Sequence, residues 1–504
     1  MEQFTKRYQD NYNLLKKLLP SEDILVHEFA TADNRPCALM YADGMVNKEL
    51  LGDLAERPLK GFLLDDTPND GDTSAPNALE RVKERLLFPE VKEAETPKDA
   101  CMELLDGNAL LLVDGIDCAI VIGAKLLPTR AITEPPTDVA LKGPREGFIE
   151  DVKVNMTLVR KRLKTPDLRM EVQRVGRRSQ SSVCLCYLDG ICDTKIKDEV
   201  KARMENIDVD CILDSSYIAT LISERHHSIF RSVGTTERPD VFSAKLAEGR
   251  VGVLVDGSPI ALTVPYTQVE DFQSNEDYYI SPCMATIFRL LRAIAVVAAL
   301  LLPAFYVCTQ LFKMQLLPLG LTLTIAESTA RLPLSPSMEV FLVLFVFEVL
   351  REASVRMPKY VGASLSIVGA LVLGEAAVSA GFLSTPTIIV VAFSGICLYT
   401  VPNFTETGSI LRWLYLIVAG SLGPFGLVLA VAFTLYYLIT ADNFSTPPLA
   451  PFSPLITHDL KDALAKYDLR SLNERPEIYH SPNRTRLKTA KKEKKNEKPD
   501  TRPR

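Results

Sequence analysis

The stretch Ala293-Ile-Ala-Val-Val-Ala-Ala-Leu-Leu-Leu-Pro-Ala-Phe-Tyr-Val-Cys-Thr-Gln-Leu-Phe312 contains no charged residue. Its length is close to the ~20 apolar residues that an α-helix needs to cross the hydrocarbon core of a bilayer. Arg289 and Arg292 stand just before it, and basic residues beside a first span favour the cytoplasmic side. The first few dozen residues lack the apolar run of a secretory signal peptide. We therefore predict an integral membrane protein whose large N-terminal region stays on the cytoplasmic side.

Hydropathy divides the 504-residue chain, which has a formal net charge of -6, into three parts. The chain is polar to about Tyr279, apolar over 293–440, and then first Pro-rich and finally basic. Length and these composition changes predict several domains. They are an α/β subdomain over 1–125, a second over 126–285 with a linker near 126–150, a helical transmembrane domain of four to six spans over 286–441, and a largely disordered cytoplasmic tail over 442–504.

The N-terminal region contains an internal repeat. Cys37–Gly44 resembles Cys184–Gly190, because each is an apolar strand that ends in Asp-Gly. Leu104–Gly115 resembles Leu246–Gly257, and in both a further apolar run follows the Asp-Gly pair. Asp-Gly between two apolar runs is typical of a β-hairpin, whose turn needs positive φ. The sequence therefore predicts two related α/β subdomains.

Charged residues lie inside a predicted apolar helix that begins at Pro336 and runs to Arg356. Glu348 has Arg351 and Glu352 at i+3 and i+4, on one helix face. Charge inside a span is costly and usually faces a bundle interior or a water-filled path. The alternative is salt bridging between subunits or at the membrane interface. The pore or gating candidates in this helix are Glu339, Glu348, Arg351 and Glu352.

The next predicted span runs from Val361 to Gly381. Small residues recur at every fourth position in it, which lets helices approach closely. Glu375 lies in the same span and is a further pore or gating candidate. The helix-packing residues are Gly362, Ser366, Ala370 and Gly374.

The remaining apolar segments leave the number of spans open. Leu316–Ile325 is too short to cross and predicts a re-entrant or interfacial piece, whereas Thr387–Thr400 predicts another span. The run from Arg412 to Thr440 is interrupted by glycines and Pro424, so it is either one broken, tilted helix or a hairpin. With both chain ends cytoplasmic, the number of crossings is even, and four and six both fit.

The sequence carries no signature of an enzyme. It has no Walker loop, catalytic triad or metal signature, so we predict no catalytic activity, no metal and no cofactor. Its ten cysteines include no CxxC pair and indicate reduced, buried thiols. Cys184 and Cys186 alternate on a predicted strand and are expected to face opposite sides. Acidic residues are interleaved with the basic ones in the polar loops, which argues against nucleic-acid binding.

Ordered motifs run from Glu134 to Pro454. In this order they resemble the A subunit of bacterial spore germinant receptors, the GerA family. The motifs of the N-terminal region are Gly143-Pro-Arg145-Glu146-Gly-Phe148, Asn155, Gly176-Arg177-Arg178 and Thr236-Glu237-Arg238-Pro-Asp240. Those near the spans are Asp277-Tyr-Tyr279, Arg289-Leu-Leu-Arg292, Leu302–Val307, Phe347–Ala353 and Gly374–Val378. The chain departs from the family pattern at Phe230-Arg231, where the family usually has Phe-Pro.

The resemblance implies a multi-pass protein of the spore inner membrane that assembles with B and C receptor subunits. It also implies a homo-oligomer, a pentamer, that conducts cations and starts germination when a nutrient is bound. Structural or assembly roles are implied for Arg145, Glu146, Arg177, Arg178, Glu237, Arg238 and Asp240. Two alternatives stay open: a paralogue from a SpoVA operon that forms an amplifying ion channel without its own nutrient partner, and a secondary transporter, which broken helices and intramembrane charge would fit.

Overall fold

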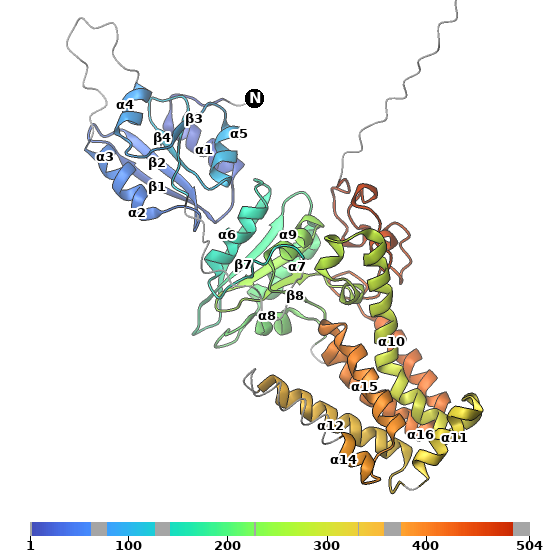
Figure 1. Cartoon of the computed structure of the whole chain (residues 1–504). Helices are drawn as coiled ribbons and strands as arrows, with labels where there is room; N and C mark the ends of the chain where they lie inside the picture. Colours follow the sequence, from blue (N-terminus) through green and yellow to red (C-terminus); the bar gives the residue numbers. More distant parts are fainter. Residues whose placement is uncertain are drawn as a thin grey trace, which may run out of the picture. The chain divides into compact units, whose positions relative to one another are not determined.

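The computed structural model describes residues 3–61, 78–125, 142–225, 228–330, 332–356 and 374–486 (Figure 1). Contacts divide these residues into two compact units. The α/β unit contains the N-terminal region up to Ser223, residues 233–265 and residues 467–486. The helical unit contains residues 224–232 and 266–466. The units therefore interleave along the chain instead of following one another as four consecutive domains.

The first copy of the repeat forms a five-stranded antiparallel sheet with strand order β1-β2-β4-β5-β3. Both faces of its central strands are buried, with Leu39 and Leu111 in one apolar cluster and Met40 and Leu110 in the other. The strands are β1 Ile24–Ala30, β2 Pro36–Ala42, β3 Val91–Ala94, β4 Ala109–Val113 and β5 Ala119–Ile122. The helices are α1 Tyr8–Leu18, α2 Lys48–Leu51, the π-helical turn η1 Gly52–Glu56, α3 Arg57–Lys60, α4 Ala78–Arg85 and α5 Pro97–Leu105.

The second copy repeats this plan with strand order β6-β7-β9-β10-β8, again antiparallel throughout. Its strands are β6 Leu168–Val175, β7 Ser181–Leu188, β8 Gly234–Thr236, β9 Val251–Val255 and β10 Ala261–Val264. Its helices are α6 Val152–Arg162, α7 Thr194–Glu205, α8 Ser215–Ile222 and α9 Pro239–Ala247. Helices and strands follow in the same order in both copies, which confirms the predicted α/β class of the N-terminal region.

Hydrogen bonds also recur at matched positions of the two copies. The Asn11 amide donates to the Thr5 carbonyl at 2.6 Å and accepts from the Thr5 amide at 2.8 Å. Asn155 forms the same pair of bonds with Ile149, at 2.5 Å and 2.9 Å. These closed rings fix the entry of the chain into α1 and α6, because they satisfy backbone groups ahead of each helix.

The Asp-Gly pairs have the roles that turn chemistry predicts. Gly115 and Gly257 adopt φ of 93° and 84° in the hairpins that join β4 to β5 and β9 to β10. The Asp114 carboxylate accepts the Tyr8 amide at 2.9 Å, and Asp256 accepts the Val152 amide at 3.3 Å. Each aspartate thus caps the first helix of its own copy.

The prediction for Cys184 and Cys186 is wrong. Both side chains lie in the same buried cluster, with their sulfur atoms 3.6 Å apart. Successive side chains of a strand point to opposite faces, so residues i and i+2 lie on the same face.

Within the α/β unit, a buried ion pair joins the two copies. Arg160 of α6 donates through Nε and Nη2 to the Asp23 carboxylate at 2.9 Å and 2.7 Å. The two side chains are 2% and 5% exposed. The Glu22 amide also donates to the carbonyl of Met170 on the edge strand β6 at 3.2 Å. The contact therefore occupies part of a strand edge that would otherwise lack partners.

Six α-helices form most of the described part of the helical unit (Figure 1). They are α10 Pro282–Phe312, α11 Leu319–Thr329, α12 Pro336–Arg356, α14 Gly374–Ser379, α15 Thr385–Tyr399 and α16 Thr405–Thr440. Among the described residues, Pro282–Phe312 and Pro402–Thr440 are long and apolar enough to cross a membrane, with a mean hydropathy of 2.2 each. The predicted start of a helix at Pro336 is confirmed.

The long helix α16 is a hairpin, which decides the alternative that the sequence left open. Gly423 has non-helical angles, φ 65° and ψ -155°, and Pro424 follows it. The Tyr415 hydroxyl donates to the Thr434 hydroxyl at 2.9 Å. In a continuous helix these residues would lie about 28 Å apart. The two halves, 405–422 and 424–440, therefore run antiparallel.

The prediction of a largely disordered tail does not hold for residues 442–486. Phe444 and Ala450 are fully buried, and Ile478 and Tyr479 are 5% and 4% exposed. The Arg475 Nε atom donates to the Ala247 carbonyl at 2.8 Å inside the α/β unit. These buried side chains anchor a segment whose prolines suggested disorder. The basic residues 487–504 lie outside the described residues.

Candidate functional site

A charged cluster lies among the apolar helices of the helical unit. Glu348 of α12 accepts from Arg412 of α16 at 2.7 Å through one carboxylate oxygen. Its other oxygen is 2.7 Å from Nη2 of Arg351, one turn along α12. Arg351 Nη1 also donates to the Ser409 hydroxyl at 2.9 Å. The cluster therefore ties α12 to the first half of α16.

The cluster is buried at Arg412 and half-buried at Glu348 and Arg351, and it carries more positive than negative charge. The Arg412 side chain is 1% exposed and that of Glu348 is 17% exposed. Arg412 Nη1 donates to Ser394 of α15 at 3.3 Å, and Ser394 donates to the Ala299 carbonyl of α10 at 2.8 Å. Arg412 Nε is buried and has no hydrogen-bond partner among the described residues. The contacts of Arg412 therefore link α16 to α12 and α15, and Ser394 extends the link to α10.

The structure brings together only part of the predicted candidate set. Glu348 and Arg351 pair at i+3 as predicted, whereas Glu352 pairs with Arg356 at 2.6 Å on the exposed side. Glu375, the second residue of α14, is exposed. Gly374 is the first residue of α14; the other helix-packing residues, Gly362, Ser366 and Ala370, lie outside the described residues.

Sequence reasoning missed Arg412. The sequence predicts that an apolar run begins at Arg412, but α16 begins at Thr405, so Arg412 lies two turns inside the helix. The available signal was a single arginine that lies seven residues after the start of a long apolar helix.

Glu339 lies apart from this cluster, near the start of α12. Its side chain is 1% exposed and accepts the backbone amide of Ser384, the N-cap of α15. A carboxylate at a helix N-terminus is stabilised by the helix dipole. Nearby, Thr387 donates to the Tyr306 hydroxyl at 3.3 Å. Glu339 therefore joins the starts of α12 and α15 close to the end of α10.

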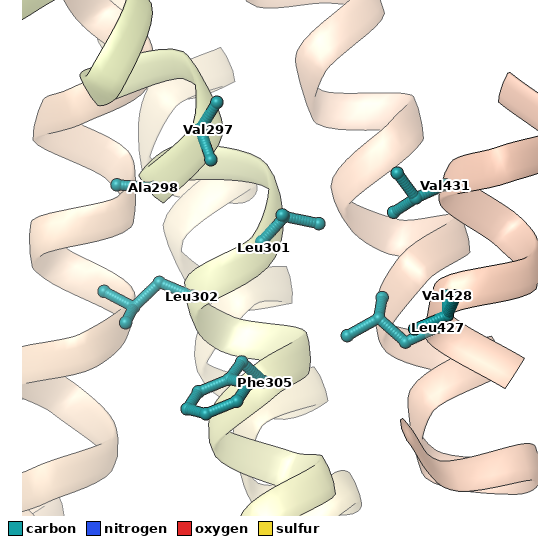
Figure 2. Close-up of a pocket in the computed structure, with 8 residues that line it drawn as sticks. All are labelled: Val297, Ala298, Leu301, Leu302, Phe305, Leu427, Val428 and Val431. Carbon is teal, nitrogen blue, oxygen red and sulfur yellow. The ribbon is translucent and has the colours of Figure 1, made fainter. Parts of the chain in front are cut away.

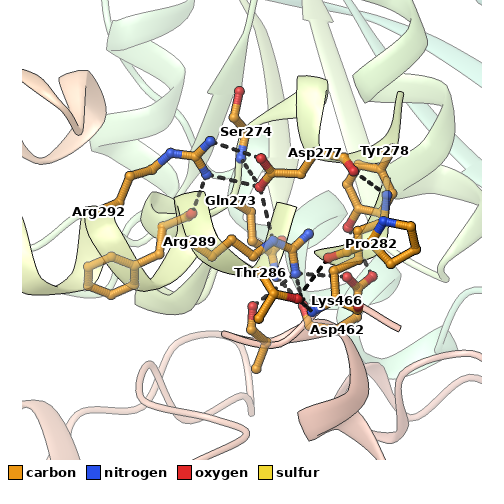
Figure 3. A network of polar contacts seen from close by, with 12 residues as sticks. Gln273, Ser274, Asp277, Tyr278, Pro282, Thr286, Arg289, Arg292, Asp462 and Lys466 are labelled. Carbon is orange, nitrogen blue, oxygen red and sulfur yellow. Dashed lines mark hydrogen bonds and ion pairs between the residues drawn. The ribbon is translucent and has the colours of Figure 1, made fainter. Parts of the chain in front are cut away.

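A second ionic network surrounds the first turns of α10 (Figure 3). Arg289 Nε and Arg292 Nη2 donate to the carboxylate of Asp277 at 2.9 Å and 2.8 Å. Arg289 also donates to Asp462 at 2.9 Å. Burial would raise the pKa of Asp277, but hydrogen bonds from Arg292, the Ser274 amide and Arg289 outweigh it and hold the pKa below the usual range. The side chains of Arg289 and Asp277 are 0% exposed.

The C-terminal segment completes this network from the other side, as Figure 3 shows. The Lys466 ammonium donates to the Asp277 carbonyl and lies 4.7 Å from the ring centre of Tyr278. The backbone amide of Lys466 donates to the Thr286 hydroxyl at 3.0 Å. Arg289, which the sequence analysis identifies as a residue flanking a span, therefore holds the C-terminal segment against the base of α10, while Arg292 pairs with Asp277.

Residues 224–232, which we call the finger, contact both ends of the α16 hairpin; 226 and 227 lie outside the described residues. At one end, Thr407 donates to the Ile229 carbonyl at 2.5 Å. At the other end, Arg225 donates to the Thr440 carbonyl at 3.2 Å. Phe230, 9% exposed, belongs to the apolar cluster between the halves. Both ends of α16 therefore meet within one short segment.

Most family-motif residues lie in ion pairs of the second subdomain. Arg238, 1% exposed, donates to Asp240 at 2.8 Å and to the Pro144 carbonyl at 3.0 Å, which docks the linker on α9. Arg177 pairs with Asp208 at 2.5 Å and Arg178 with Asp210 at 3.7 Å, both exposed. Glu237 is buried and Arg145 is exposed.

Glu146 pairs with Lys161 at 2.9 Å and with Arg162 at 2.8 Å, both on α6. Burial would raise the pKa of Glu146, but the two cations hold the pKa below the usual range. Within the described ranges, no three His, Cys, Asp or Glu side chains are grouped so that they could hold a metal ion.

The chain is similar in sequence to known proteins. The chain is 34% identical to spore germination protein KA of Bacillus subtilis over 476 residues, 94% of this chain and 86% of that protein. It is 34% identical to the B. subtilis uncharacterized membrane protein YfkQ over 463 residues, 92% of this chain and 89% of that protein. The crystal structure of the N-terminal domain of the A subunit of the Bacillus megaterium spore germinant receptor GerK3 matches with 30% identity and a TM-score of 0.40, covering 52% of this chain and 96% of that one.

The match extends beyond single relatives. The family described as Bacillus/Clostridium GerA spore germination protein matches residues 12–478, which include both copies of the repeat and all the described helices of the helical unit. The chain belongs to the GerA family of spore germination proteins.

Proposed function

We propose that this chain is the membrane-spanning A subunit of a germinant receptor and that copies of it assemble into a nutrient-gated cation channel. The buried Glu348–Arg412 pair inside apolar helices carries the proposal, because a passive membrane anchor needs no such charge. The family membership supports the role in germination, and the similarity to the membrane protein YfkQ supports the membrane setting.

The outer surface of the helical unit supports insertion in a bilayer. Large apolar side chains face outward along its helices, among them Leu319 at 75%, Phe425 at 73% and Phe433 at 69% exposure. An apolar surface of this extent is unusual on a soluble monomer. A hollow of about 420 Å³ between α10 and α16 is lined by eight apolar residues, including Phe305 and Val431 (Figure 2). The acyl chains of lipids can pack against such an apolar surface.

The contacts support a common membrane orientation of the helices. The base of α10 and both ends of α16 carry polar contacts at one end of the bundle, whereas Phe312 meets the Gly423 kink at the other. Each half of α16 is about 26 Å long, close to the thickness of the hydrocarbon core. With α12 and α15, the described residues supply five helical segments that run between the two ends. The predicted span Val361–Gly381 lies mostly outside the described residues.

In this proposal, the charged cluster is a latch that holds the closed channel. Arg351 and Arg412 neutralise Glu348, so the cluster does not offer a free carboxylate to a cation. It instead fixes α12 against α16, and moving Glu348 away would leave Arg412 buried without its partner, at a cost of about 3–5 kcal/mol. Ion flow would begin when nutrient binding to a B-type partner supplies that energy.

The partners and location follow the family resemblance. We propose B and C receptor subunits as partners, the spore inner membrane as the location, and the spore core as the side that holds the α/β unit. Exposed apolar residues of α12, such as Phe345 at 54%, offer surface for lipid or for neighbouring copies in a ring.

The test is potassium release from spores that carry Glu348→Gln at the normal protein level. Neutralising Glu348 leaves Arg412 buried without its counter-charge, so we expect potassium to leak before any nutrient is added. Glu352→Gln is the matched control, because Glu352 lies one turn further along α12 and its side chain is 60% exposed. Release that matches the parent strain before and after nutrient, in both variants, would remove the latch from the proposal.

A further inference from the structure

Helix α8 of the second subdomain exposes an apolar face. Leu213, just before the helix, is 66% exposed, Tyr217 is 45% exposed and Leu221 is 37% exposed. Tyr217 and Leu221 are four residues apart in the helix and therefore lie along one side of it. The opposite side, with Ser215, Ile218 and Ile222, is buried in the subdomain. The apolar face is therefore additional to the face that the fold requires.

The matching helix of the first subdomain lacks such a face. Helix α4 occupies the same place in the element order, and its exposed residues include Glu80, Glu84 and Arg85. The segment Ser215–Ile222 contains no charged residue at all. The fold of the repeat thus tolerates charged residues on the exposed side of this helix. The second copy has leucine and tyrosine there instead.

Chain connectivity ties α8 to the end of the spanning helices. Only Ser223 separates Ile222 from the finger, and Arg225 of the finger donates to the Thr440 carbonyl at the end of α16. Three residues of chain reach at most about 11 Å. The covalent chain therefore limits how far the C-terminal turn of α8 can lie from Arg225. In the first copy, residues 86–90 join α4 directly to β3, and there is no finger.

We infer that the exposed face of α8 lies in the interface of the lipid bilayer, with Leu213, Tyr217 and Leu221 at the boundary between headgroups and acyl chains. Short amphipathic helices bind there through apolar area, and tyrosine favours this zone because its ring is apolar and its hydroxyl is wet. This inference rests on the proposed function, since it needs α16 to span the membrane. The occupant is lipid, and a second protein chain on this face is an outcome that the test distinguishes.

The test uses tryptophan fluorescence of the full chain in phosphatidylcholine vesicles. The chain has one tryptophan, so Trp413→Phe provides a silent background. Into it we introduce Leu221→Trp or, as a second variant with a smaller change in shape, Tyr217→Trp. Leu87→Trp is the control on the first copy, where Leu87 is 62% exposed, and Phe433→Trp reports on the span. The vesicles carry bromine, a quencher, on acyl carbons either near the headgroups or near the bilayer centre.

We expect emission from position 221 or 217 to shift to the blue and to be quenched most by bromine near the headgroups. Position 87 should keep the unquenched emission of water-exposed tryptophan, and position 433 should be quenched by bromine near the bilayer centre. Unquenched emission at 221 and 217 together with quenching at 433 would overturn this inference alone; if that emission is blue-shifted, a protein covers the face. Unquenched emission at 433 would overturn the spanning proposal itself.

Discussion

The two copies of the repeat share a fold but differ on one face. Both have five strands in the same order and the same asparagine ring ahead of the first helix, at Asn11 and Asn155. They differ where α4 and α8 end: a short connection follows α4, whereas the finger follows α8 and contacts both ends of α16. The shared features build a core, and the differing feature, the finger, is a segment of the helical unit that follows only the second copy. Comparing the two copies therefore distinguishes the features that the fold requires from the features that only one copy has.

The largest expected effect comes from breaking the contact that joins the copies. Arg160→Ala leaves the buried Asp23 carboxylate without its bidentate partner, and we expect a loss of about 3–5 kcal/mol in the stability of that contact. Hydrogen exchange of β1 and α6 in the detergent-solubilised chain measures it. Arg177→Ala, which removes an exposed pair, should change exchange by no more than about 1 kcal/mol. Equal effects of the two changes would show that the Arg160 contact does not hold the copies together.

Next in size is the attachment of the finger. Phe230→Ala removes a ring buried between the halves of α16 and should destabilise the finger by about 3 kcal/mol. Faster hydrogen exchange at both ends of α16, with unchanged exchange in β1 and β2, is the expected readout. The control on the first copy is Leu87→Ala, which should cost less than about 0.5 kcal/mol because Leu87 is mostly exposed. Unchanged exchange at the α16 ends would mean that Phe230 does not anchor the finger.

The smallest expected effect on stability comes from a pair of matched glycines. Gly44 and Gly190 occupy matched turns with φ of 78° and 72°, so alanine at either costs about 1–2 kcal/mol of backbone strain. A Cβ at Gly190 would meet nothing within 4 Å, whereas one at Gly44 would lie 2.4 Å from Oγ1 of Thr157 in the other copy. Gly44→Ala should therefore lower the free energy of unfolding more than Gly190→Ala.

Thr157→Ala provides the control for this pair. Combined with Gly44→Ala, it should bring the cost close to that of Gly190→Ala, because the collision is removed. If the two single glycine variants unfold at the same denaturant concentration, the copies do not pack as closely as their contact at Thr157 requires.

Local chemistry was predictable from the sequence. The Asp-Gly pairs identified the hairpins at Gly115 and Gly257, and the apolar strands before them identified the repeat. The pairing of Glu348 with Arg351 followed from helical spacing alone. These features depend on residues close in the chain, where turn and helix geometry fix which side chains meet.

Contacts between distant residues were not predictable. Arg412 is 64 residues from Glu348, and Asp462 is 173 residues from Arg289, so no spacing rule joins them. The hairpin in α16 depends on the Gly423 backbone and on packing against α10, which a hydropathy pattern does not record. The folded segment 442–486 was missed because its prolines suggested disorder, although Phe444 and Tyr479 bury it.

The most direct test of the latch is a charge exchange between α12 and α16. Potassium release without nutrient is measured in spores that carry Glu348→Arg, Arg412→Glu or both changes, at matched protein levels. Each single change puts like charges together and should abolish nutrient control. The double change restores a carboxylate beside two guanidinium groups, so we expect nutrient-dependent release to return. Double-variant spores that behave no better than the single variants, or single variants that keep normal nutrient control, would contradict the account.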